Sequence, residues 1–260
     1  MSAAPSERNV VVNGEACRVW EKGHGAPVGF LAGPGGVPRW TPFLDALAEH
    51  HRVVVPSLPG FPGATGHERL DDHLDWITAA LDLLCASGLE GASLVGASVG
   101  GMLAAEVAAL SPAMVARLVL VAPFGLFDAR EPTADPFAVR AEDAAALLSA
   151  HPERLRARSA LPEGADATEW SIVLSRANAA AARLLWPLGE RGLVKRLHRV
   201  TAPTLLVWGD ADRVIPPSYA DRFAARIGAP VQRETIAGAG HLVDLDAPSA
   251  LARVIDGFLR

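Results

Sequence analysis

Residues 93–101 read Ser-Leu-Val-Gly-Ala-Ser-Val-Gly-Gly, and this stretch decides the fold. The apolar residues up to Val95 predict a short buried strand, and the alanine-rich run that follows predicts a helix ending before Pro112. Between them lies a Gly-x-Ser-x-Gly segment, where a sharp turn would project the Ser98 hydroxyl into the open and glycine would avoid collisions between strand and helix. This setting favours a nucleophilic serine, and a purely structural glycine-rich turn is the alternative.

Strand-like and helical segments alternate on both sides of this junction. The alternation predicts parallel strands joined by right-handed crossovers, and strands that are apolar throughout suit a sheet covered on both faces. Near the N-terminus, two strand-like runs flank Asn13-Gly14, a dipeptide that favours a tight hairpin. The expected strands include 28–31, 53–55, 93–95, 118–121, 204–208 and 231–236, and the expected helices include 40–50, 71–86, 217–227 and 248–259.

The stretch 123–188 interrupts the alternation of strands and helices. It is rich in Ala, Arg, Pro and Glu, with helical segments near 139–150 and 168–186 and no clear strand. We interpret it as a helical cap inserted over the C-terminal edge of the sheet. The predicted domains are therefore a core made of residues 1–122 and 189–260 and a cap made of residues 123–188.

A serine nucleophile needs a base within hydrogen-bond reach and an acid that orients the base. Asp212 follows the expected strand 204–208, and His241 follows the last expected strand in a glycine-rich loop. Catalytic groups of open α/β sheets gather at the carboxyl ends of the strands, and the chain order Ser, Asp, His suits this architecture. Asp210 is the alternative for the acid.

These motifs together resemble the α/β-hydrolase superfamily, and in particular its small, capped, single-domain serine hydrolases. The resemblance spans residues 10–260 and rests on the turn around Ser98, Trp-Gly-x-x-Asp ending at Asp212, Gly-x-Gly-His ending at His241, and the glycine-rich turn 33–36. It implies an α/β fold with a mostly parallel eight-stranded sheet, flanking helices and a helical cap. It also implies a Ser98–His241–Asp212 triad.

Acyl transfer needs two donors for the developing oxyanion. The first is normally the backbone N–H after the nucleophile, here that of Val99. The second normally comes from a loop where the family often has His-Gly-x, but this chain has Ala32-Gly33-Pro34, and proline carries no N–H. Three interpretations stay open: Gly35 donates, another group donates or one donor suffices, or the chemistry is not ordinary ester hydrolysis.

The expected reaction is hydrolysis of a small or medium, largely apolar ester, thioester or lactone through an acyl-enzyme at Ser98. Carbon–carbon bond hydrolysis, a non-hydrolytic biosynthetic reaction and ligand binding with little turnover are the alternatives. Aromatic side chains are the weak candidates for a substrate pocket, because aromatics at helical spacing more often pack in a core. These candidates are Trp40, Phe124, Phe127 and Trp170, with Phe137 and Trp186 as further aromatics of the cap.

The chain has 260 residues, of which 50% are hydrophobic, and this suits one large α/β domain. A net charge of -5 without a dense Lys/Arg run argues against a nucleic-acid partner. The first residues do not have the basic and then apolar pattern of a signal peptide, and no apolar run nears the roughly 20 residues of a membrane helix. We therefore expect no signal peptide, no membrane contact and a cytoplasmic location. No motif indicates a metal or cofactor. The expected partner is a small-molecule substrate, and a homodimer stays open.

Overall fold

The computed structural model of the chain describes residues 4–260, apart from the side chains of residues 141 and 142. Its sheet has eight strands in the order β1-β2-β4-β3-β5-β6-β7-β8. The pairs β1–β2 and β2–β4 are antiparallel, and every other neighbouring pair is parallel. The predicted eight-stranded, mostly parallel sheet is therefore confirmed. The strands are β1 (Ser6–Val12), β2 (Glu15–Lys22), β3 (Pro27–Leu31), β4 (Arg52–Pro56), β5 (Ala92–Ala97), β6 (Val115–Val121), β7 (Thr204–Gly209) and β8 (Val231–Ile236).

The predicted hairpin at Asn13-Gly14 joins β1 to β2. Asn13 and Gly14 have φ of 51° and 80°. Two successive residues with positive φ are typical of a type I′ turn, whose twist matches that of the flanking strands. The register follows, because Val12 pairs with Glu15 directly across the turn.

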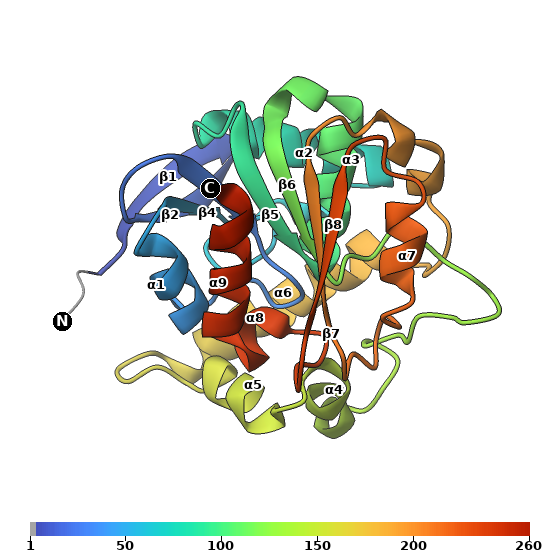
Figure 1. Cartoon of the computed structure of the whole chain (residues 1–260). Coiled ribbons are helices and arrows are strands. Elements are labelled where there is room, and N and C mark those ends of the chain that lie inside the picture. Colours follow the sequence, from blue (N-terminus) through green and yellow to red (C-terminus); the bar gives the residue numbers. More distant parts are fainter. Residues whose placement is uncertain (1–3) are drawn as a thin grey trace.

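Helices cover both faces of the sheet (Figure 1). Neighbouring residues of a strand point to opposite faces, so Leu94 of β5 and Leu206 of β7 join one core while Val95 and Val207 join the other. Helices α2, α3 and α7 pack on the first face, and α1 and α9 pack on the second. The helices are α1 (Pro42–Ala48), α2 (His73–Ala86), α3 (Ser98–Leu110), α4 (Ala141–Leu148), α5 (Pro152–Ser159), α6 (Ala167–Leu185), α7 (Tyr219–Ala224), α8 (Val243–Asp246) and α9 (Pro248–Leu259), with 3-10 turns at His67–Arg69, Pro112–Met114, Leu193–Lys195 and Leu197–Arg199.

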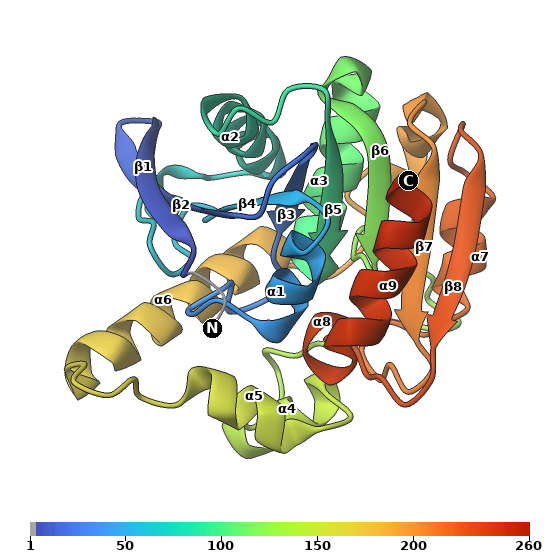
Figure 2. The same ribbon diagram turned by 60° about the vertical axis from the view of Figure 1, so that its left-hand side comes forward.

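Helices α4, α5 and α6 lie between β6 and β7 in the chain, within the stretch 123–188. Both views place α4 and α5 below the sheet, and Figure 2 shows α6 below β1 and β2 (Figures 1 and 2). The expected segments 139–150 and 168–186 correspond to α4 and α6. Helix α5 was not expected, because it is short and highly charged and its sequence has no apolar stripe.

Within residues 4–260, no helix combines the length and the apolar character that crossing a bilayer requires.

Candidate active site

Ser98 stands on the sharp turn between β5 and α3, with a φ of 54°. Positive φ is uncommon for a residue with a side chain and indicates a strained position. Both flanking positions need glycine, because backbone atoms approach them too closely for a side chain. A Cβ on Gly96 would lie 2.6 Å from the Gly100 carbonyl oxygen, and one on Gly100 would lie 2.3 Å from the Leu31 carbonyl oxygen. The Gly-x-Ser-x-Gly pattern is therefore what allows α3 to pack against β3 and β5 directly after the serine.

The structure brings Ser98, His241 and Asp212 together. Ser98 Oγ lies 2.7 Å from His241 Nε2, and His241 Nδ1 lies 3.0 Å from Asp212 Oδ2. The side chains of His241 and Asp212 are fully buried at their contact. The short distances on both ring nitrogens define one tautomer, in which Nδ1 carries the proton toward Asp212 and Nε2 accepts from the serine.

Asp212, rather than Asp210, faces the histidine. The second oxygen of Asp212 accepts backbone N–H groups from Val214 at 2.8 Å and Ile215 at 3.0 Å, which fix the carboxylate in the turn after β7. Asp210 instead accepts the N–H of Gly238 at 2.7 Å. Asp210 thus supports the loop that carries His241 and takes no part in the contact between His241 and Asp212.

Two loops meet closely at this point. A Cβ on Gly209, at the end of β7, would lie 2.2 Å from the Ala239 carbonyl oxygen, and Ala211 N–H donates to the same oxygen at 3.0 Å. The loop after β8, which carries His241, therefore lies directly against the loop after β7, which carries Asp212. This close contact helps to position the two side chains relative to each other.

A buried carboxylate on α8, Asp246, also holds this region, and the sequence analysis missed it. It accepts the N–H of Gly240 at 2.7 Å and the N–H of Ala150 at 2.9 Å, and the Ser149 hydroxyl donates to it. The stretch between α4 and α5 is thereby joined to the histidine loop. No sequence signal separates Asp246 from its neighbour Asp244, because both are carboxylates after the same Gly-His segment.

The turn 33–36 lies beside Ser98. A Cβ on Gly33 would lie 3.2 Å from Ser98 Cβ. Gly36 N–H donates to the Gly33 carbonyl at 3.0 Å, and Gly35 has a φ of 78°, which with Pro34 before it is typical of a type II turn. Within residues 4–260 the Gly35 N–H makes no hydrogen bond and stays available.

Val99 is the second residue of α3. The first four N–H groups of a helix have no partner within the helix, so the Val99 N–H points out of the α3 N-terminus next to Ser98.

The four aromatic candidates lie in different places. Phe124 is buried, and its ring meets that of His241 edge-on at 5.6 Å. Trp40 packs on Trp20, and the Trp170 indole donates to the Ser159 carbonyl at 2.9 Å. Phe127 is 39% exposed. Phe124 is thus the candidate that contacts His241.

A cavity of about 480 Å³, the inner cavity, lies between the turn 33–36 and helices α4, α5 and α6. Pro34 and Gly35 line it, whereas Ser98 itself is only 1% exposed. The rest of the lining is mainly apolar, and its polar side chains are those of Arg156, Arg158, Ser159 and Asn178. The apolar residues include Pro38, Phe137, Val139, Leu148, Leu155 and Leu174.

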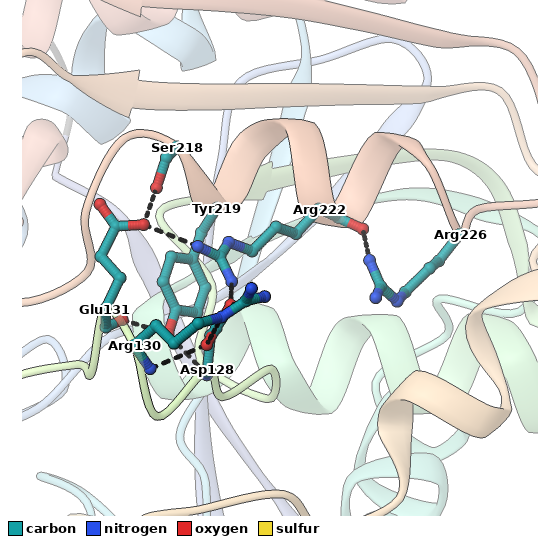
Figure 3. Close-up of polar contacts among 7 residues, drawn as sticks. All are labelled: Asp128, Arg130, Glu131, Ser218, Tyr219, Arg222 and Arg226. Carbon is teal, nitrogen blue, oxygen red and sulfur yellow. Dashed lines mark hydrogen bonds and ion pairs between the residues drawn. The ribbon is translucent and has the colours of Figure 1, made fainter.

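The segment that leads from β6 toward α4 is fastened to α7 (Figure 3). The Tyr219 hydroxyl donates to the Glu131 carbonyl at 2.8 Å and accepts the Asp128 N–H at 3.0 Å. Arg222 pairs with both carboxylates, and Ala134 N–H donates to Val214 O at 2.8 Å. This network holds the segment against the loop that carries Asp212. Arg130 and Arg222 lower the pKa of Asp128 through hydrogen bonds, so the pairs form between charged groups.

Among the described residues, no cluster of three or more His, Cys, Asp or Glu side chains is arranged to hold a metal ion.

A family model described as the alpha/beta hydrolase family matches residues 24–254. The chain is 31% identical to the dihydrolipoyllysine-residue acetyltransferase component of the acetoin cleaving system of Pseudomonas putida, over 98% of this chain and 70% of that protein. It is 27% identical to 2-hydroxy-6-oxo-2,4-heptadienoate hydrolase of Pseudomonas putida, over 97% of this chain and 95% of that protein.

Solved structures show the same fold. A membrane phospholipase A, described as a bacterial virulence factor, matches with a TM-score of 0.78 and 24% identity, over 98% of this chain and 86% of that chain. At this level of identity the likeness concerns the fold alone.

Proposed function

Because the chain belongs to the alpha/beta hydrolase family, we propose that it is a serine hydrolase that acts through Ser98, His241 and Asp212. The observation that carries the proposal is the continuous hydrogen-bond chain from Ser98 Oγ through the imidazole to Asp212, with distances of 2.7 Å and 3.0 Å. A buried serine held against a buried, oriented imidazole is the arrangement that makes a hydroxyl nucleophilic.

The reaction would proceed through an acyl-enzyme. Ser98 Oγ attacks the carbonyl carbon of an ester while His241 Nε2 takes the hydroxyl proton. The tetrahedral intermediate collapses, the bond to the alcohol breaks, and His241 returns the proton to the leaving oxygen. His241 then removes a proton from water, which attacks the acyl carbon. The second tetrahedral intermediate collapses, the bond between the acyl carbon and Ser98 Oγ breaks, and His241 returns the proton to Ser98 Oγ as the acid leaves. Asp212 accepts the hydrogen bond of the Nδ1–H throughout and stabilises the imidazolium.

The oxyanion would be held by two backbone donors, the N–H groups of Val99 and Gly35. Val99 supports this role because it stands at the α3 N-terminus, where helix N–H groups favour negative charge. Gly35 supports it because its N–H makes no hydrogen bond within residues 4–260 and the residue lines the inner cavity.

The stretch 123–188 would serve as a cap over this site. Two contacts and one cavity support that role. The segment between α4 and α5 reaches Asp246, Phe124 touches His241, and α4, α5 and α6 line the inner cavity. The mainly apolar lining fits a small or medium, largely apolar acyl group, in an ester, thioester or lactone.

Covalent labelling tests the nucleophile. A fluorophosphonate probe should label the wild-type protein, and Ser98→Ala should abolish the labelling. Ser93→Ala, in the strand β5 that leads to Ser98, is the matched control and should label normally. Labelling that persists in Ser98→Ala would overturn the assignment. A panel of p-nitrophenyl esters then measures turnover, which should be lost in His241→Ala.

Carbon–carbon bond hydrolysis is a second candidate, favoured by the similarity to 2-hydroxy-6-oxo-2,4-heptadienoate hydrolase. The same three residues would serve it. Incubation with a 2-hydroxy-6-oxo-dienoate and with a matched ester, followed by mass analysis of the products, separates the two. The mass also reveals whether water is added, which distinguishes hydrolysis from acyl transfer, cyclisation or lyase chemistry. No turnover of either compound would favour a ligand-binding protein.

A further inference from the structure

Arg158, in α5, is a charged side chain in an enclosed position. It is 10% exposed, and it lines the inner cavity together with Pro34 and Gly35. It also lines a second hollow on the other side of α5, beside Trp40. Arg158 therefore stands in the wall of a cavity whose lining is otherwise mainly apolar, and its ion-pair partner Asp244 lines the second hollow.

The contacts of Arg158 leave its donors unused. Its ion pair with Asp244 Oδ2 is 3.7 Å long, which exceeds the length of a hydrogen bond. Within the described residues the guanidinium makes no hydrogen bond, although it carries five N–H donors. Arg196, by contrast, binds Glu106 with two hydrogen bonds at 2.7 Å and 2.5 Å.

A guanidinium that is 10% exposed and makes no hydrogen bond loses much of its hydration and gains little in return, which is costly. A planar fork of donors matches a carboxylate, which can accept two of its N–H groups at once. The inner cavity, which Arg158 lines, offers room for such a group next to apolar surface. The side chain is thus suited to a ligand that brings its own negative charge.

We propose that Arg158 binds a carboxylate of the substrate, and that the inner cavity takes an ester or thioester whose apolar chain ends in a carboxylate. The proposal rests on the proposed hydrolase function and adds the substrate class. The ester carbonyl would lie at Ser98, the chain along the apolar lining, and the carboxylate on the guanidinium.

The nearby acidic residues do not block this role. Burial raises the pKa of Asp244, although Arg158 partly offsets it, so this carboxyl takes up a proton more readily than an exposed aspartate. Asp246 already accepts hydrogen bonds from Gly240, Ala150 and Ser149. Burial lowers the pKa of Arg158, and the charges of Asp244 and Asp246 oppose that change. Arginine remains protonated near neutral pH.

The test compares two substrate series of equal chain length: mono-p-nitrophenyl esters of dicarboxylic acids and p-nitrophenyl esters of the matching monocarboxylic acids. The wild type should prefer the carboxylate-ended series by at least about tenfold in kcat/KM at the best chain length, which corresponds to one charge-assisted hydrogen-bonded pair. Arg158→Gln should abolish this preference, mainly through KM, while hydrolysis of the neutral series and fluorophosphonate labelling persist.

Two further variants control for charge and folding. Arg156→Gln, whose side chain lines the same cavity but is exposed, should change the preference less than threefold. Asp244→Asn removes the competing charge and should keep or raise the preference. A loss of preference in Asp244→Asn, or an equal effect of both arginine variants, would overturn the assignment to Arg158.

The outcomes also separate this inference from the hydrolase proposal. Hydrolysis of both series at equal rates overturns the carboxylate site but leaves the hydrolase intact. If neither series is hydrolysed, the hydrolase proposal for esters fails. In that case, calorimetric titration of unlabelled dicarboxylates into the full chain decides the site: binding that Arg158→Gln abolishes supports it, and no binding overturns it.

Discussion

Asp246 accepts a hydrogen bond from the N–H of Gly240, the residue before His241, at 2.7 Å. The same carboxylate accepts the Ala150 N–H and the Ser149 hydroxyl from the segment between α4 and α5. One buried charge therefore positions the loop that carries the proposed base and joins it to the proposed cap. Asp246 is a positioning residue, since it touches neither Ser98 nor the imidazole in the described contacts.

Replacing Asp246 tests this role. Asp246→Asn replaces the two carboxylate oxygens with one carbonyl oxygen. The Gly240 and Ala150 N–H groups share one oxygen of Asp246 and the Ser149 hydroxyl uses the other, so the amide leaves either the two N–H groups or the hydroxyl without its acceptor. We expect a loss of about 1–3 kcal/mol in the free energy of unfolding, measured by urea denaturation, and a lower kcat with little change in KM. Asp221→Asn, whose ion pair with Arg233 is exposed, should change stability by less than about 0.5 kcal/mol. Equal effects of the two variants would contradict the role.

The two aspartates of the loop after β7 provide a second matched pair. Asp212→Asn should lower kcat about 10⁴-fold, because the amide favours the wrong tautomer of His241. Asp210→Asn retains an oxygen that can accept the Gly238 N–H, so its kcat should fall less than tenfold. Steady-state kinetics on the best ester measures both. If the Asp210 variant is the more damaged of the two, the acid has been misassigned.

Pro34 tests the source of the second oxyanion donor. Pro34→Ala restores an N–H at the position where the family often has its donor. If Gly35 donates, kcat/KM should stay within about threefold of the wild type, because a donor is already present. A rise toward the roughly 10²–10³-fold effect of one donor would show that the wild type works with Val99 alone.

The Tyr219 hydroxyl holds the segment after β6 (Figure 3). Tyr219→Phe leaves the Asp128 N–H and the Glu131 carbonyl without this partner. We expect a loss of about 1–2 kcal/mol in urea denaturation and faster proteolysis within residues 128–140. Arg226→Gln removes a single exposed hydrogen bond to the Arg222 carbonyl and serves as the control. Unchanged proteolysis in Tyr219→Phe would contradict the anchoring role.

The contribution of Glu106 to the free energy of unfolding should depend on pH. Burial raises the pKa of this carboxyl, but hydrogen bonds from His73 and Arg196 outweigh burial and leave the pKa below its ordinary value of 4.5. A lowered pKa contributes stability that is present above the ordinary pKa and is lost as the pH falls. Glu106→Gln should cost about 3–5 kcal/mol at pH 7, since it leaves Arg196 without its charged partner. The difference in the free energy of unfolding between the wild type and Glu106→Gln should become smaller as the pH falls below 4.5. A difference in urea denaturation that does not change with pH would refute the view that Glu106 is held in its charged form.

Local sequence determined the features that depend on the backbone of a few adjacent residues. Asn13-Gly14 specified a hairpin because both residues tolerate positive φ. Gly96 and Gly100 specified the turn around Ser98, since any side chain there would collide with backbone atoms. Apolar strands without alternation specified a sheet covered on both faces, and this also fixed the edge to which Ser98, Asp212 and His241 belong.

The tertiary structure decided what depends on contacts between distant segments. Asp210 accepts the Gly238 N–H, whereas Asp212 faces Nδ1 of the His241 ring, and only the folded loop distinguishes the two aspartates. Phe124, rather than Trp40, Phe127 or Trp170, lies against the histidine because of how the chain leaves β6. Asp246 and Arg158 look like ordinary surface charges in the sequence, and the roles proposed for them depend on burial between α5, α8 and the histidine loop. Sequence patterns report local conformation and polarity, whereas the partners of a charged side chain are set by the packing of the whole chain.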